Sequence, residues 1–280
     1  MRGEFFSAQP PPSWEAVLSL PANLTTALVL VDYAAHRQTT PTPWPYQVLA
    51  RLSESDRARL AAMRSVLAHG TNLRDFLLGR IGAHEVAQRE WSALLARLEG
   101  LRRGEVTELI ILGILSGLEW YREEMEPDPA VEAILQRLGS REPGPDALAD
   151  PDRRRLGLEA LLASWGYRDP CAPLALASDP GAFHEALVRV LAALWEQGMD
   201  QAWDEGREEL ERAVALAGGG ALAGTGEELV LRLTGLQPPA SGAGLLRQAR
   251  QISFYPCSKP FFDLALDMDI FGCQFHSLAL

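Results

Sequence analysis

The segment from Asp179 to Leu216 constrains the fold of this chain more than any other. Asp179-Pro180 is a helix start signal, since Asp caps a helix and Pro fits its first position. The glycines at 218–220 mark its end. In between, apolar residues recur at helical spacing and form a single stripe, which consists of Phe183, Leu187, Val190, Leu191, Leu194, Met199, Trp203, Leu210 and Val214. The pattern predicts one long amphipathic helix.

The remaining faces of this helix are charged, so its stripe should pack against an antiparallel neighbour or a second copy of the chain. Gly198 and Gly206 would let the helix bend or pack closely. The segment 105–124 is apolar on most sides, which predicts that it is central in the core. Further helices are predicted at 23–36, 53–68, 71–78 and 85–101, and from Asp128-Pro129 onward.

The apolar period changes near the C-terminus. Residues 251–255 and 271–278 alternate polar and apolar side chains, which predicts two strands that pair as a small β-ribbon. Residues 14–20 are interpreted as a short apolar turn. The predicted fold class is therefore mainly α, a multi-helix bundle with a small C-terminal β-ribbon. Residues 1–280 form one helical domain in this interpretation, and the loop at 139–151 leaves open a division into two lobes, 1–140 and 150–280.

Composition excludes several classes of protein. The net charge is −11, which disfavours nonspecific coating of nucleic acid, because phosphate binding needs clustered Lys and Arg. Three cysteines are too few for a disulfide framework and favour a reduced, cytoplasmic environment. We expect no signal peptide, because residues 1–20 are acidic and proline-rich. The longest apolar stretch, 109–118, is about half of what a membrane-spanning helix needs, so we expect no membrane partner.

No catalytic motif is visible, so we predict neither catalytic residues nor a cofactor. The pairs His84-Glu85 and His184-Glu185 lack the second histidine of a metalloprotease helix. The glycine-rich run at 218–226 follows a helix rather than a strand, which is the wrong end of a helix for phosphate. His36 and His69 lie near the ends of predicted helices, where we interpret them as caps.

The metal candidate is Cys273 with His276, and Cys257 is a third possible ligand. Thiolate and imidazole both suit zinc. A strand places Cys273 and His276 on opposite faces, however, and a fourth ligand is missing. We therefore favour a packed cysteine and an exposed histidine over a zinc site.

The candidate ligand pocket involves three aromatic residues on apolar helix faces: Trp120, Tyr121 and Trp195. Core packing is the simpler interpretation of these rings. A helical bundle can, however, enclose an apolar pocket lined by aromatic side chains. An enzyme or carrier with such a small-molecule pocket is therefore the alternative function.

Several segments resemble the N-terminal region of bacterial ArsR-type transcriptional regulators. The resemblance is carried by PSWEAVLSL (12–20), TNLRDFLLG (71–79), ALWEQGMDQAWDEGREELER (193–212), LVLRLTGL (229–236) and QISFYPCSKPFF (251–262). Their order along the chain also matches. In those regulators a helical region precedes a C-terminal winged helix that binds DNA.

The resemblance implies a non-enzymatic sensor and dimerisation region. The expected partner is a second copy of the chain. No winged-helix reader is apparent before Leu280, so we expect contact with DNA only through a reader domain not seen in this chain.

Overall fold

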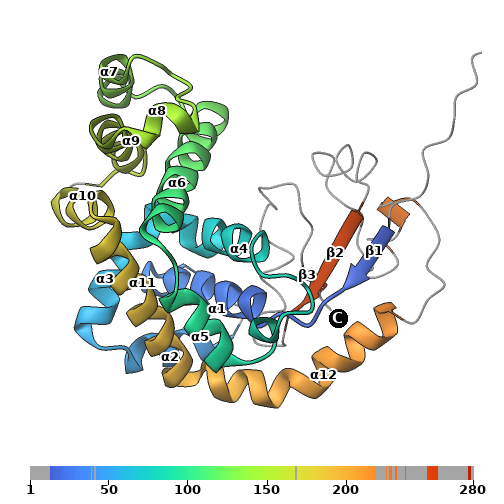
Figure 1. The fold of residues 1–280 in the computed structure, drawn as a ribbon. Helices are drawn as coiled ribbons and strands as arrows, with labels where there is room; N and C mark the ends of the chain where they lie inside the picture. The colour runs from blue at the N-terminus through green and yellow to red at the C-terminus, as the bar shows by residue number, and fades with distance from the viewer. Residues whose placement is uncertain are drawn as a thin grey trace, which may run out of the picture.

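The computed structural model describes residues 13–38, 40, 42–167, 169–218, 251–257 and 277–278, together with positions 225, 227–228, 231 and 237. Most of these residues are helical, and the predicted class of a helical bundle with a small β-ribbon is confirmed. Figure 1 shows the bundle on one side and the strands, with α12 beneath them, on the other.

The elements follow one another from a short N-terminal strand through the helices to two C-terminal strands. They are β1 (Ser13–Ala16), α1 (Leu20–Ala35), α2 (Trp44–Arg51), α3 (Glu54–Leu67), η1 (Ala68–Gly70), α4 (Thr71–Leu78), η2 (Val86–Gln88), α5 (Trp91–Glu99), α6 (Arg103–Glu124), α7 (Pro129–Leu138), α8 (Pro145–Ala149), α9 (Pro151–Ser164), α10 (Cys171–Ser178), α11 (Pro180–Leu194), η3 (Trp195–Met199), α12 (Asp200–Gly218), β2 (Gln251–Pro256) and β3 (Ser277–Leu278).

Helix α1 lies deepest in the bundle. It is buried on nearly every side, and α2, α3, α4 and α11 all contact it. Helix α6, which the sequence places at the centre, buries one broad face and exposes its last turn. Residues from both halves of the chain, 1–140 and 150–280, contribute to one contiguous apolar core.

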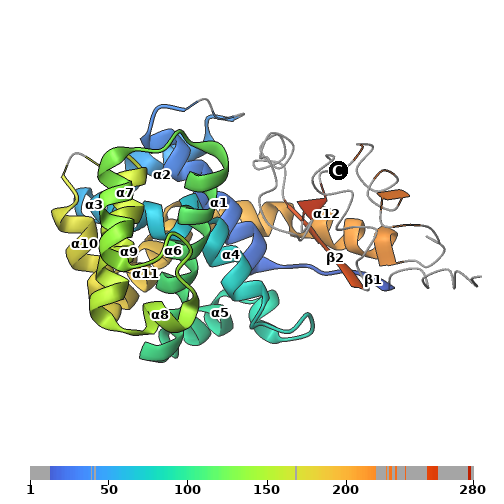
Figure 2. The ribbon, with the colours of Figure 1, turned by 90° about the horizontal axis from the view of Figure 1, so that it is seen from above.

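The predicted helix over 179–216 is divided into α11 and α12 by a turn of π-helix at η3. Gly198 has a φ of 150° there, which a residue with a side chain rarely adopts. A Cβ at this position would also lie 3.2 Å from the Val48 side chain on α2. The single long helix predicted for this segment is therefore bent at Gly198, and the bend sends α12 away from the bundle (Figure 2).

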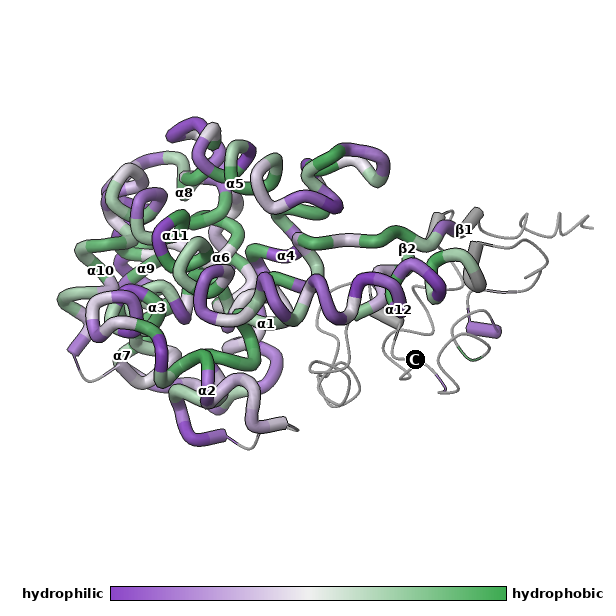
Figure 3. The backbone as a smooth tube through the Cα atoms, turned by 90° about the horizontal axis from the view of Figure 1, so that it is seen from below, coloured by the Kyte–Doolittle hydropathy of each residue, from purple (hydrophilic) through white to green (hydrophobic). Residues whose placement is uncertain are grey.

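The two parts of the apolar stripe belong to one core cluster, although their helices contact different elements. In α11, side chains such as Phe183 and Leu191 are buried in the bundle core. In α12, the buried stripe residues Trp203 and Leu210 lie on the helix that contacts β1 and β2. Figure 3 shows hydrophobic and hydrophilic residues alternating along α12. These stripe residues are thus covered by the chain itself.

The strands differ from the sequence interpretation in one respect. Residues 13–16, within the expected apolar turn, form strand β1, which pairs in parallel with β2. The register aligns Trp14 with Ile252 and Ala16 with Phe254. Strand β3 pairs in parallel with the other end of β2, so the order in the sheet is β1-β2-β3. Short strands without strong alternation are readily mistaken for turns.

Close helix packing in the bundle depends on glycines of α6. A Cβ on Gly113 would fall inside van der Waals contact with the backbone of Val66, at the end of α3. The Asn72 amide donates to the same Val66 carbonyl at 2.8 Å, and Ser116 Oγ donates to Asn72 Oδ1 at 3.0 Å. Helices α3, α4 and α6 are therefore joined at this point without room for another methyl group.

We predict that Gly113→Ala lowers the free energy of unfolding by about 2 kcal/mol or more, because backbone atoms of α3 must move to admit the methyl group. Gly104→Ala is the matched control in the same helix, since a Cβ there meets nothing within 4 Å. It should leave stability unchanged or raise it by up to about 1 kcal/mol. Urea denaturation measures both, and equal effects of the two substitutions would contradict the close packing.

Candidate functional site

The most concentrated polar chemistry in the described residues surrounds Asp32, near the C-terminal end of α1. Its side chain is 1% exposed, although a carboxylate is costly to remove from water. The preceding residues of α1 are almost all apolar, so the carboxylate enters the interior with them. It must therefore be compensated by partners from neighbouring elements.

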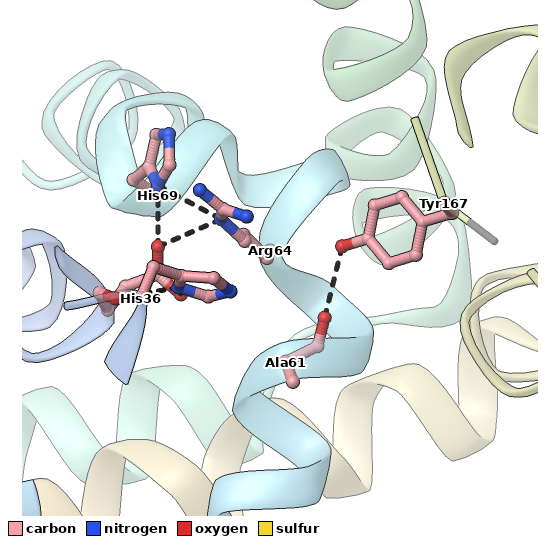
Figure 4. Close-up of polar contacts among 6 residues, drawn as sticks. His36, Ala61, Arg64, His69 and Tyr167 are labelled. Atoms are coloured by element: carbon pink, nitrogen blue, oxygen red, sulfur yellow. Dashed lines mark hydrogen bonds and ion pairs between the residues drawn. The ribbon is translucent and has the colours of Figure 1, made fainter. Parts of the chain in front are cut away.

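Three basic side chains from three elements meet this carboxylate (Figure 4). His69, on η1, donates from Nδ1 to Asp32 Oδ2 over 2.5 Å. Arg64, on α3, donates from Nε to the same oxygen over 3.1 Å. His36, the C-cap of α1, donates from Nδ1 to the Asp32 backbone carbonyl at 2.8 Å, and lies 3.6 Å from Oδ1. Asp32 Oδ1 is buried and has no hydrogen-bond partner among the residues that the structure describes.

Unusual backbone conformations occur beside the cluster. Arg37, Ala68 and His69 have φ values of 58°, 45° and 63°, in the left-handed region that residues with side chains rarely adopt. Each such residue costs of order 1 kcal/mol and persists only where its surroundings hold it. The turns after α1 and between α3 and α4 are therefore fixed by contacts, among which the hydrogen bond from His69 to Asp32 is the shortest.

Aromatic rings border the cluster. Tyr33 meets the His69 ring edge-on with centroids 5.0 Å apart, and Trp165 lies 5.1 Å from His69 on another side. The Arg64 guanidinium lies over the Trp165 ring at 5.3 Å. Burial, and then the charge of Asp32, raises the pKa of Tyr33, and burial also raises the pKa of Tyr167. Both phenols therefore stay neutral at physiological pH.

The contacts also fix which imidazole atoms remain available. A carboxylate or carbonyl oxygen only accepts, so Nδ1 carries the hydrogen in His69 and in His36. Their Nε2 atoms remain free to accept a hydrogen bond or a proton. Because Arg64 shares Asp32 Oδ2 with His69, the charge of the carboxylate is already compensated within the cluster. The arrangement suits binding better than nucleophilic catalysis.

We expect Asp32→Asn to destabilise the protein by about 2–3 kcal/mol, because it removes a charged acceptor from Arg64 and His69 in a buried position. Asp75→Asn is the control, since that carboxylate is 38% exposed and pairs only with its neighbour Arg74. Its effect should stay below about 1 kcal/mol. Thermal or urea unfolding compares the stabilities of the two variants. A similarly small loss in both would show that the buried network around Asp32 does not stabilise the fold.

The aromatic residues predicted to line a pocket lie in two separate places. Tyr121 is buried near the end of α6, where its hydroxyl accepts from the Asp128 backbone before α7, and Trp120 beside it is partly exposed. Trp195 opens η3 and stacks on Trp91 of α5, with ring centroids 4.8 Å apart. Figure 1 shows the α6–α7 connection and the α11–α12 junction at opposite ends of the bundle. The structure therefore does not bring the three together.

The metal prediction involves one described residue. Cys257 is fully buried beside Thr26, with its sulfur 3.8 Å from Thr26 Oγ1, and burial raises its pKa to about 11. Cys273 and His276 lie outside the described residues. Among the residues that are described, no group of three His, Cys, Asp or Glu side chains could hold a metal ion.

Alkylation of the native protein at mildly alkaline pH should therefore modify Cys171 and spare Cys257. Cys171 is exposed, although hydrogen bonding to Asp169 raises its pKa, whereas Cys257 must be uncovered before it reacts. Asp169→Asn should speed the reaction of Cys171 and leave Cys257 unchanged. Peptide mass spectrometry after a short pulse of iodoacetamide reads both sites, and labelling of Cys257 at the rate of Cys171 would contradict its burial.

Sequence reasoning did not single out Asp32 or Arg64, and interpreted His36 and His69 as helix caps. One signal was present, because Asp32 is the only charged residue between positions 20 and 35, in a run that is otherwise mostly apolar. A carboxylate in such a run must find a cation. His36 follows four residues later, but the approach of Arg64 and His69 depends on how α3 packs on α1.

Comparisons with known proteins add no assignment. No family model matches the chain, and neither a curated protein nor a solved structure matches it. Within the described ranges, the helices are too short or too polar to cross a membrane.

Proposed function

We propose that this chain is the sensor and dimerisation region of an ArsR-like transcriptional regulator, and that it catalyses no reaction. The observation that carries the proposal is spatial. Segments that resemble those regulators are far apart in the sequence, yet those that are described meet around β2. Segments that resembled those regulators only by chance would not be expected to contact one another in the fold.

The contacts around β2 join four of these segments. Residues 13–16 form β1 beside β2, and α12 contacts both strands. Val17 and Tyr255 form a small apolar cluster with Ala22, and Leu78, the last residue of α4, packs on it. Asn23 on α1 donates to the carbonyl of Pro256 at the end of β2, over 3.0 Å. The fifth segment, 229–236, lies largely outside the described residues.

This arrangement supports a division of roles. The Asp32 cluster lies in the bundle, and η1 connects it directly to α4, which reaches the strands. A signal bound in the bundle would therefore act on the unit formed by β1, β2 and α12. We place the protein in the cytoplasm and assign DNA contact to a separate winged-helix reader, because the net charge of −11 opposes direct binding. The homodimer rests on the resemblance alone, since the stripe residues Trp203 and Leu210 of α12 are already buried within the chain.

The test is cross-linking of the tagged natural gene product to DNA in its own cells, followed by sequencing of the recovered DNA. We expect enrichment at a few discrete promoters, and altered transcription of the same genes when the gene is deleted. An untagged strain is the control. Uniform recovery along the genome, with unchanged transcripts, would refute the regulator. Light scattering on the purified chain tests the dimer separately, and a monomer at all soluble concentrations would remove that part.

A further inference from the structure

The guanidinium of Arg64 is fixed by its neighbours, but its two terminal nitrogens donate no hydrogen bond to the described residues. Nε donates to Asp32 Oδ2, and the plane rests on Trp165, so two contacts fix its orientation. The side chain is 20% exposed. Among the described residues, neither terminal nitrogen has a hydrogen-bond partner, although a guanidinium carries five donors. A rigid fork with two free nitrogens is preorganised for an oxyanion.

We propose that Arg64, together with His69, binds a small carboxylate at this end of the cluster. The carboxylate would accept two parallel hydrogen bonds from the terminal nitrogens of Arg64. His69 lies on the same side of the cluster as the guanidinium, as Figure 4 shows, and its free Nε2 can take up a proton beside the bound anion. A guanidinium fork fits carboxylate and phosphate alike. We assign the carboxylate because Asp32 already neutralises Arg64, which leaves little positive charge for a dianion.

The charges around the site support binding coupled to proton uptake. Helix α1 contributes Asp32, Tyr33 and His36, α3 contributes Arg64, and η1 contributes His69. Tyr167 approaches from beyond α9, where its hydroxyl donates to the Ala61 carbonyl at 3.2 Å. With both imidazoles neutral, Asp32 and Arg64 cancel. An added carboxylate leaves one negative charge in excess, which a proton on His69 removes.

The turn that carries His69 offers a route from this site to the strands. Gly70 follows His69 with a φ of 141°, and a Cβ there would lie 3.0 Å from both the Thr25 carbonyl and the Val29 side chain of α1. The turn is thus wedged against α1, and α4 begins immediately after it. That the carboxylate is the signal of the regulator rests on the proposed function. The binding of a carboxylate does not rest on that function. If acetate binds but no promoter DNA is recovered, the site stands and the regulator is refuted. If promoter DNA is recovered but acetate does not bind, the regulator stands and the site is refuted.

The experiment titrates the whole protein with sodium acetate at constant ionic strength, balanced with sodium chloride, and follows the histidine side-chain nitrogens by NMR. His69 is assigned with His69→Gln. We expect saturable binding in the millimolar range, with His69 moving toward the imidazolium form. Calorimetry in two buffers of different ionisation enthalpy should report proton uptake. Absence of saturation, or shifts no larger than those with chloride alone, would overturn the proposal.

Substitutions locate the binding. Arg64→Lys keeps the charge but loses the fork, and should weaken acetate binding about tenfold or more. Arg59→Lys is the control on the same helix, since Arg59 also pairs with a buried carboxylate, that of Asp56, over 2.8 Å. It should bind acetate like the unsubstituted protein. Equal losses in both variants would overturn the site at Arg64. Inorganic phosphate is the competing probe, and tighter binding of phosphate than of acetate would refute the assignment to carboxylates.

Discussion

The burial of α1 on nearly every side is the constraint on which the other features depend. A helix in this position must be surrounded, and α2, α3, α4 and α11 surround it. Its apolar residues stabilise the bundle by leaving water, at roughly 25 cal/mol for each Å² of apolar surface buried. The same burial takes Asp32 into the interior. The ends of the neighbouring elements must then supply a cation and further hydrogen-bond donors at that point; Arg64 supplies the cation, and His69 a second donor.

The strained turns follow from the same requirement. A residue in the left-handed region is unfavourable by itself, and two in succession, Ala68 and His69, need compensation. The hydrogen bond of His69 to a buried carboxylate supplies it, because charged hydrogen bonds are strong where water is excluded. The hydrogen bond at Asp32 and the conformation of the backbone between α3 and α4 therefore depend on each other.

The sequence predicted the helical elements well where local signals determine them. Ser53 caps α3, Asp128 caps α7 and Asp179 caps α11, and each cap side chain accepts a hydrogen bond from a backbone N–H in the first turn. The sequence left open whether Gly198 and Gly206 allow a bend or close packing, and the structure has the bend at Gly198. Strand β1 was not predicted, since its partner β2 is more than two hundred residues away and four residues carry little alternation. The candidate site was not predicted for a similar reason. A histidine at a helix end is typical of a cap, and only the packing of α3 on α1 shows that Arg64 and His69 share one carboxylate.

The bend at Gly198 lets one helical segment contact both the bundle and the strands. A straight helix from Asp179 would keep its whole apolar stripe on one surface. At Gly198 the helix instead passes close to Val48 and turns, so that α11 completes the bundle and α12 covers the strands. The strands in turn reach back to α1 through Asn23 and Pro256. Helix α1 is therefore connected to α12 in two ways, through the strands and through its contact with η3 at the bend.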